Sequence, residues 1–75
     1  MISPNQCKAA RALLGWTQEK LASAAGIGIS TVREFELGQR KPIARNRQAI
    51  LDAFSAAGIE FIDENGGGPG LRLRR

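Results

Sequence analysis

The sequence predicts a mainly α-helical fold that ends in a short β-hairpin or strand pair. Apolar residues recur at helical spacing as far as Ala57, and a glycine follows each helical segment. After Gly58 the apolar residues alternate with polar ones, as they do in strands. A chain of 75 residues allows one domain at most, and its core must be small.

The first two helices are predicted from their start and stop signals. Residues 3–6 combine a capping serine, a proline at the first helical position and a glutamine three residues after the cap. An apolar row begins at Cys7, and Gly15 ends this helix. Thr17 then caps a second short helix, which Gly26 ends.

The remaining elements are predicted in the same way. A third helix opens at Gly28 or Ser30, with Gly38 after its last turn, and a fourth spans about residues 44–57. Two strands are predicted around residues 59–61 and 71–73. The segment 64–70 between them is too rich in glycine for regular structure, so we expect a loop.

The charge distribution favours a polyanionic partner. The net charge is +4, and the basic excess lies before residue 52 and again after residue 70, whereas residues 52–64 carry only acidic charges. Such a field attracts nucleic acid, the commonest intracellular polyanion. A merely soluble charged surface is the alternative that charge alone leaves open.

The residue inventory argues against an enzyme. The chain has no histidine, no tyrosine and a single cysteine, so neither a general base of the usual kind nor a zinc cluster can be assembled. We therefore expect no catalytic residues, no metal and no cofactor. Cys7 falls in an apolar helical row and is interpreted as a packing residue.

The same features favour the cytoplasm. One cysteine cannot form an internal disulfide, and no apolar run approaches the roughly 18 residues that span a bilayer. The N-terminus lacks the pattern of a secretory signal. We expect no membrane association.

The stretch from residue 18 to residue 38 carries the functional signal. Leu21 anchors the first of two helices, and the small Ala22 lets the second helix approach closely. Gly26 can adopt the left-handed conformation of a tight turn, after which Val32 and Phe35 return to the core. Two unrelated amphipathic helices would not require small residues at these offsets.

With these residues the sequence resembles the lambda repressor and Cro-like, or XRE-type, helix-turn-helix family over about residues 5–57. The resemblance rests on Gln18, Leu21, Ala22, Gly26, Val32, Glu36, Gly38 and Pro42. It implies a lambda-repressor-like DNA-binding bundle of four or five helices over residues 1–58. It further implies a transcriptional regulator, most simply a repressor, whose helix 29–37 enters the major groove of double-stranded DNA.

The resemblance also implies which residues contact DNA. The DNA-binding candidates are Thr17, Gln18, Ile29, Ser30, Thr31, Arg33, Glu34, Arg40 and Lys41. Gln18 matches a phosphate-contacting glutamine, and Arg40 and Lys41 lie in the loop after the recognition helix.

The chemistry of three candidates agrees with base readout. Arg33 can bind guanine, Glu34 can accept from the cytosine amino group, and Ile29 can contact a thymine methyl. Glu34 is equally well explained as a solvated charge. Gly28 stands where the family usually has Ser or Thr, which leaves open whether Ile29 or Ser30 leads into the groove.

Arg11 and Glu36 match an arginine and a glutamate that pair across the first and third helices in some relatives. We expect a partly buried structural ion pair. Two unconnected surface charges are the alternative.

Residues 59–75 form an extension that we expect to mediate a symmetric homodimer. One recognition helix reads only a few base pairs, so selective DNA binding generally needs two copies of the protein. A lone hairpin is only marginally stable in water, and its unpaired strand edges can hydrogen-bond to a second copy. The dimerisation candidates are Ile59, Phe61, Leu71 and Leu73. The alternative is a hairpin folded back on its own helices.

A second function class stays open at this stage. The same fold serves antitoxins, which neutralise a toxin partner and repress their own operon. Such a protein would carry a toxin-wrapping segment, whereas few residues follow the fourth predicted helix here.

Overall fold

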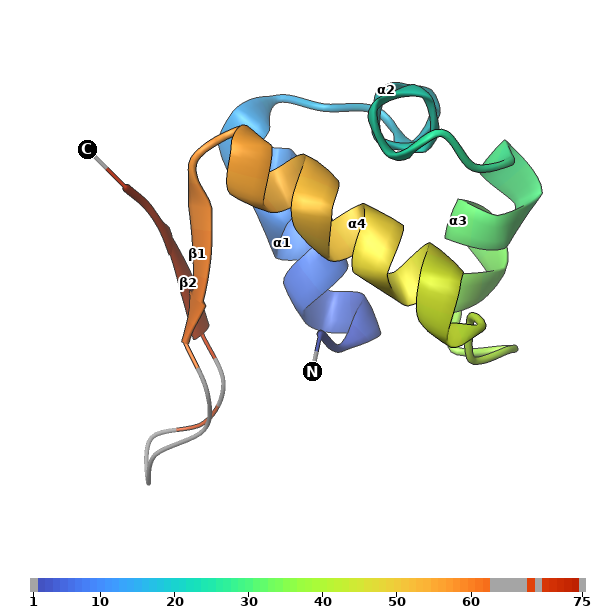
Figure 1. Ribbon diagram of the computed structural model, residues 1–75. Coiled ribbons are helices and arrows are strands. Elements are labelled where there is room, and N and C mark those ends of the chain that lie inside the picture. The colour runs from blue at the N-terminus through green and yellow to red at the C-terminus, as the bar shows by residue number, and fades with distance from the viewer. Residues whose placement is uncertain (1, 63–67, 69, 75) are drawn as a thin grey trace.

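The computed structural model describes residues 2–62, 68 and 70–74, and it is mainly helical (Figure 1). Four helices precede a two-stranded antiparallel sheet, which confirms the predicted fold class. The elements are α1 (Pro4–Leu14), α2 (Gln18–Ala25), α3 (Ile29–Glu36), α4 (Ala44–Ala56), β1 (Ile59–Ile62) and β2 (Gly70–Leu73). Most of the predicted glycine-rich loop, and Arg75, lie outside the described residues.

The predicted caps of the first two helices are present. At the start of α1, Gln6 N donates to Ser3 Oγ at 3.1 Å, and Ser3 N donates to Gln6 Oε1 at 2.9 Å. This reciprocal pair satisfies two backbone amides that a helix start leaves unbonded. Thr17 Oγ1 accepts from Lys20 N at the start of α2.

The helix ends follow two different patterns. Gly15 and Gly26 themselves cap α1 and α2 in the left-handed conformation, with φ of 68° and 69°. The helices α3 and α4 are instead capped by Leu37 and Ala57, whose backbone stays in the right-handed region. Each is therefore one residue shorter than predicted, because the glycine that follows makes the turn after the cap.

The third helix begins directly after Gly28 and not at Ser30. Gly28 is the N-cap and makes no side-chain cap hydrogen bond, so α3 begins at Ile29. A glycine cap costs only a few tenths of a kcal/mol relative to Ser or Thr.

One hydrophobic core is shared by all four helices and the first strand. Phe54 is the largest fully buried side chain of the described residues. It stacks on Trp16 with ring centroids 5.8 Å apart and lies edge-on to Phe61 at 5.9 Å. Each such aromatic pair adds about 0.5–1.5 kcal/mol beyond the burial of its area. The buried apolar residues are Ile2, Cys7, Ala10, Leu21, Ala22, Val32, Phe35, Ile50, Ala53, Phe54 and Ile59.

The hairpin packs against the helices of its own chain, on the side away from α3 (Figure 1). Ile59 pairs with Leu73 and Phe61 with Leu71, so these four side chains share the face that contacts the core. Gln6 Nε2 also donates to the carbonyl of Gly70 at 3.1 Å. The structure thus has the folded-back hairpin, and Ile59 is already buried within the monomer.

Candidate nucleic-acid interface

The helices α2 and α3 form a compact unit joined by a tight turn. Ile27 N donates to the carbonyl of Ala22 at 3.0 Å, and Gly26 supplies the left-handed residue that this closure needs. Ala22 is buried, which lets the two helices approach. The turn therefore has the small residues where a helix-turn-helix geometry requires them.

The two faces of α3 differ in what they contact. Val32, Phe35 and Glu36 are buried. Ser30 and Arg33 are exposed, and Glu34 is partly exposed. Positions 30, 33, 34 and 37 follow helical spacing and share one face, so the molecule presents a stripe of side chains to solvent. We call Ser30, Arg33, Glu34 and Leu37 the outer stripe.

Leu37 is a member of the outer stripe that sequence reasoning missed. Leu37 is 68% exposed, whereas Ile29, the residue expected to contact a thymine methyl, is partly buried against the core. Thr31 is half-buried as well. The helical spacing from Ser30 to Leu37 was the available signal, but an apolar residue is ordinarily assigned to the core.

The remaining candidates flank α3. Arg40 and Lys41 are exposed in the segment that connects α3 to α4, and Thr17 is exposed at the start of α2. Within the described residues, none of Arg33, Arg40 and Lys41 lies within ion-pair distance of a carboxylate. Their charges are therefore available to an external anion.

Glu36 accepts four hydrogen bonds from side chains of the two preceding helices. Arg11 donates from Nε to Oε2 and from Nη2 to Oε1, both at 2.7 Å, and thus binds the carboxylate in a bidentate manner. Gln18 Nε2 donates to Oε1 at 3.0 Å, and Cys7 Sγ donates to Oε2 at 3.1 Å. We call Cys7, Arg11, Gln18 and Glu36 the buried network.

The buried network determines the ionisation of its members. Burial alone would raise the pKa of Glu36, but the hydrogen bonds from Arg11, Gln18 and Cys7 outweigh it and hold that pKa below its ordinary value. The bond to Glu36 raises the pKa of Arg11. Burial, with the hydrogen bond to Glu36, raises the pKa of the Cys7 thiol, which therefore stays protonated and donates.

Two roles in the buried network go beyond sequence reasoning. From the sequence, Cys7 is predicted only as a packing residue and Gln18 only as a phosphate contact. The spacing of Cys7 and Arg11 at i and i+4 places both on one helical face, and was the signal that could have linked the thiol to the ion pair.

The described residues show neither a metal site nor a membrane-spanning helix. No three His, Cys, Asp or Glu side chains gather there as metal ligands would. None of the described helices combines the length and apolar character needed to cross a bilayer.

A comparison with family models identifies the chain. The model described as Helix-turn-helix matches residues 8–55, which include α2, the turn and α3. No curated protein matches the chain significantly. The matched segment also contains Arg11, Gln18 and Glu36, the charged and amide members of the buried network. The chain therefore belongs to the XRE, or lambda repressor-like, helix-turn-helix family of DNA-binding transcription regulators.

Proposed function

We propose that this protein is a sequence-specific repressor that inserts α3 into the major groove of duplex DNA. The outer stripe carries the proposal, because its polar side chains are exposed on one face of a helix whose opposite face is fixed in the core. Arg33 offers a bidentate donor to guanine, and Leu37 offers an apolar contact to a thymine methyl. The protein acts in the cytoplasm, by binding and not by catalysis.

The flanking residues position α3 on the phosphate backbone. Arg40 and Lys41 supply cations beyond the end of α3, and Thr17 and Gln18 supply polar groups at the start of α2. A glutamine amide has two N–H donors, and Glu36 accepts from the nitrogen that carries them. The buried network therefore orients Gln18 so that its second N–H is available to a phosphate oxygen.

We further propose that the repressor binds as a symmetric homodimer through the hairpin. In a sheet of order β1-β2 each strand has one partner and one open edge, which can add a strand from a second copy. Ile59, Phe61, Leu71 and Leu73 contact their own core, so among the described residues of the hairpin the exposed apolar side chain is Ile62, which is 41% exposed. Because the hairpin lies away from α3 (Figure 1), the two recognition helices would occupy the outer ends of the dimer.

The dimer is tested by deleting residues 59–75 and measuring mass in solution by ultracentrifugation. Since Ile59 is part of the core, the milder variant Ile62→Lys provides a second measurement on a folded chain. We expect a dimer for the parent and a monomer for Ile62→Lys. A parent that is monomeric at tens of micromolar, or an Ile62→Lys chain that stays dimeric, contradicts the proposal.

The DNA-binding function is tested by selecting bound duplexes from a random pool. We expect an inverted repeat, with half-sites separated by about 34 Å or a multiple of that spacing. Placing the selected site over a promoter should then lower transcription of a reporter in proportion to occupancy. A pool without enrichment would refute sequence-specific binding.

A further inference from the structure

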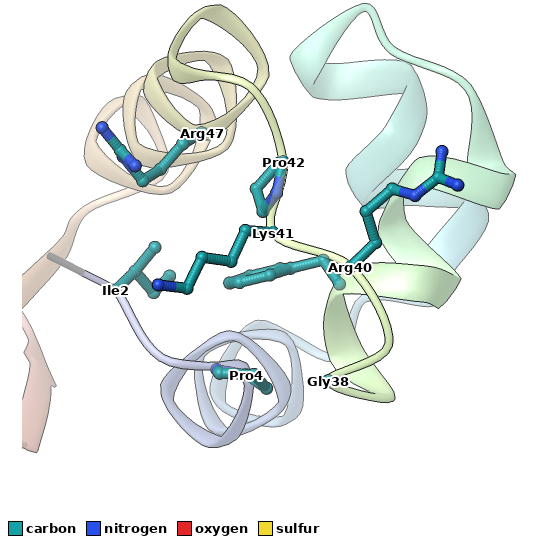
Figure 2. Close-up of a pocket in the computed structure, with 8 residues that line it drawn as sticks. Ile2, Pro4, Gly38, Arg40, Lys41, Pro42 and Arg47 are labelled. Carbon is teal, nitrogen blue, oxygen red and sulfur yellow. The ribbon is translucent and has the colours of Figure 1, made fainter.

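A cavity lies beside the end of the recognition helix, between the start of α1, the segment after α3 and α4 (Figure 2). It has a volume of about 290 Å³. Its apolar lining comes from Ile2, Pro4, Phe35 and Pro42. Ile2 and Phe35 also belong to the core, so this lining is continuous with the packed interior of the protein.

The charged residues around the cavity all have one sign. Arg40, Lys41 and Arg47 line it, and among the described residues no acidic side chain does. Within the described part of the chain, none of these three cations forms an ion pair. Figure 2 shows the Lys41 side chain reaching across the cavity toward Ile2, while the guanidinium groups of Arg40 and Arg47 extend away on opposite sides.

We propose that this cavity binds a small amphipathic organic anion, with one carboxylate and a ring or short branched hydrocarbon group. The hydrocarbon would contact the partly exposed Pro4 and Pro42 and the small part of Ile2 and Phe35 that faces the cavity, and the carboxylate would accept from Lys41. A bare inorganic anion would leave the apolar lining exposed, and a neutral hydrocarbon would leave the cations without a counter-charge. The volume is near the lower limit for ligand pockets, which favours a small ligand.

Ligand binding is coupled to DNA binding, in a step that rests on the proposed function. Arg40 and Lys41 line the cavity and are also our candidates for phosphate contacts. A carboxylate bound to Lys41 competes with a phosphate for the same ammonium group. The anion therefore acts as an inducer that weakens DNA binding.

The site is tested on the full chain without DNA, by following backbone amide resonances during titration with phenylacetate. We expect saturable shifts centred on residues 35–42 at millimolar ligand or below. Neutral phenylacetamide and inorganic phosphate should each bind about five- to tenfold more weakly, because each lacks one of the two recognised groups. Equal binding of phenylacetamide or of phosphate would overturn the proposal, as would the absence of saturable shifts.

A matched pair of charge variants localises the site. Lys41→Gln should weaken phenylacetate binding about five- to tenfold, whereas Lys8→Gln, which removes an exposed cation from α1, should leave it unchanged. Equal losses in both variants would show attraction to net charge alone and would overturn the site.

A DNA measurement separates this inference from the proposed function. Saturating phenylacetate should weaken binding of the selected duplex, and phenylacetamide should not. If the chain binds phenylacetate as described but binds no duplex, the proposed anion site is supported and the proposed repressor function is refuted. A chain that binds the duplex equally with and without saturating phenylacetate would overturn the coupling.

Discussion

At the residue scale, the most unusual feature of the described residues is the buried carboxylate of Glu36. It is 4% exposed and ionised, and it is satisfied by donors from three other side chains. A buried charge without such partners would cost several kcal/mol. Its pairing with Arg11 is implied by the family resemblance. The i, i+4 spacing places Cys7 on the same helical face as Arg11, but the hydrogen bonds that Cys7 and Gln18 donate to Glu36 also depend on how α1, α2 and α3 pack together, which the sequence pattern does not specify.

Replacing Arg11 by Ala should destabilise the fold by up to about 3 kcal/mol, because Glu36 would stay buried without its bidentate partner. The free energy of unfolding from urea titration measures this. Lys8→Ala removes an exposed cation from the same helix and serves as the control, with an expected change within about 0.5 kcal/mol. Equal stability of Arg11→Ala and the parent would contradict the role of the buried network.

The lowered pKa of Glu36 predicts a loss of stability in acid. A folded-state pKa below the unfolded value makes the stabilisation complete above the unfolded pKa, and the stabilisation is lost as pH falls through the folded pKa. Unfolding measured from neutral pH to strongly acidic pH should therefore show a steep acid limb. Glu36→Gln should be less stable at neutral pH and have a shallower acid limb, and an unchanged slope would contradict the assignment.

At the element scale, α3 combines a fixed inner face with an accessible outer stripe. Its type and position were predictable, because glycine and periodic apolar residues bound it on both sides. Its first residue was not, since a glycine cap leaves no side-chain signal. The exposure of its first residues was not predictable for a related reason, because rotation of a short helix by one residue decides whether Ile29 or Ser30 is the more exposed. In the structure Ile29 is partly buried against the core and Ser30 is exposed.

Two substitutions distinguish base reading from phosphate binding. Arg33→Ala should relax the preference at one base pair by about 1–3 kcal/mol, as expected for loss of a bidentate contact to guanine. Gln18→Ala should weaken binding to all sequences alike and also destabilise the fold, because Glu36 loses one donor. Affinities for the selected duplex and its single-base variants measure both effects. Equal losses on every duplex for Arg33→Ala would make Arg33 a phosphate contact.

At the scale of the whole molecule, the hairpin and the helices share one core. The order of the elements was predictable from periodicity and glycines. The docking of the hairpin was not, because β1 and β2 could cover either their own helices or a second chain with the same apolar face. The cavity beside Phe35 was missed for a similar reason, since it joins residues 2–4 to residues 35–47.

Binding to duplex DNA should weaken severalfold or more when salt rises from about 50 to 200 mM, because phosphate contacts release counterions. Each phosphate contact contributes about −0.9 to the slope of log affinity against log salt. Lys41→Gln should make that slope less negative by about 1, while Lys8→Gln leaves it unchanged. An affinity for DNA that does not change with salt would contradict the phosphate contacts proposed for Lys41 and the other basic side chains.

The separation of the two faces of α3 has an evolutionary consequence. Ser30 and Arg33 are exposed and make no side-chain hydrogen bond to any described residue, and Leu37 is 68% exposed, so exchanging them should change folding stability by no more than about 0.5 kcal/mol. Val32, Phe35 and Glu36 hold the helix in place whatever the outer residues are. Under the proposed function, a lineage can therefore acquire new operators through a few substitutions that selection for stability does not oppose.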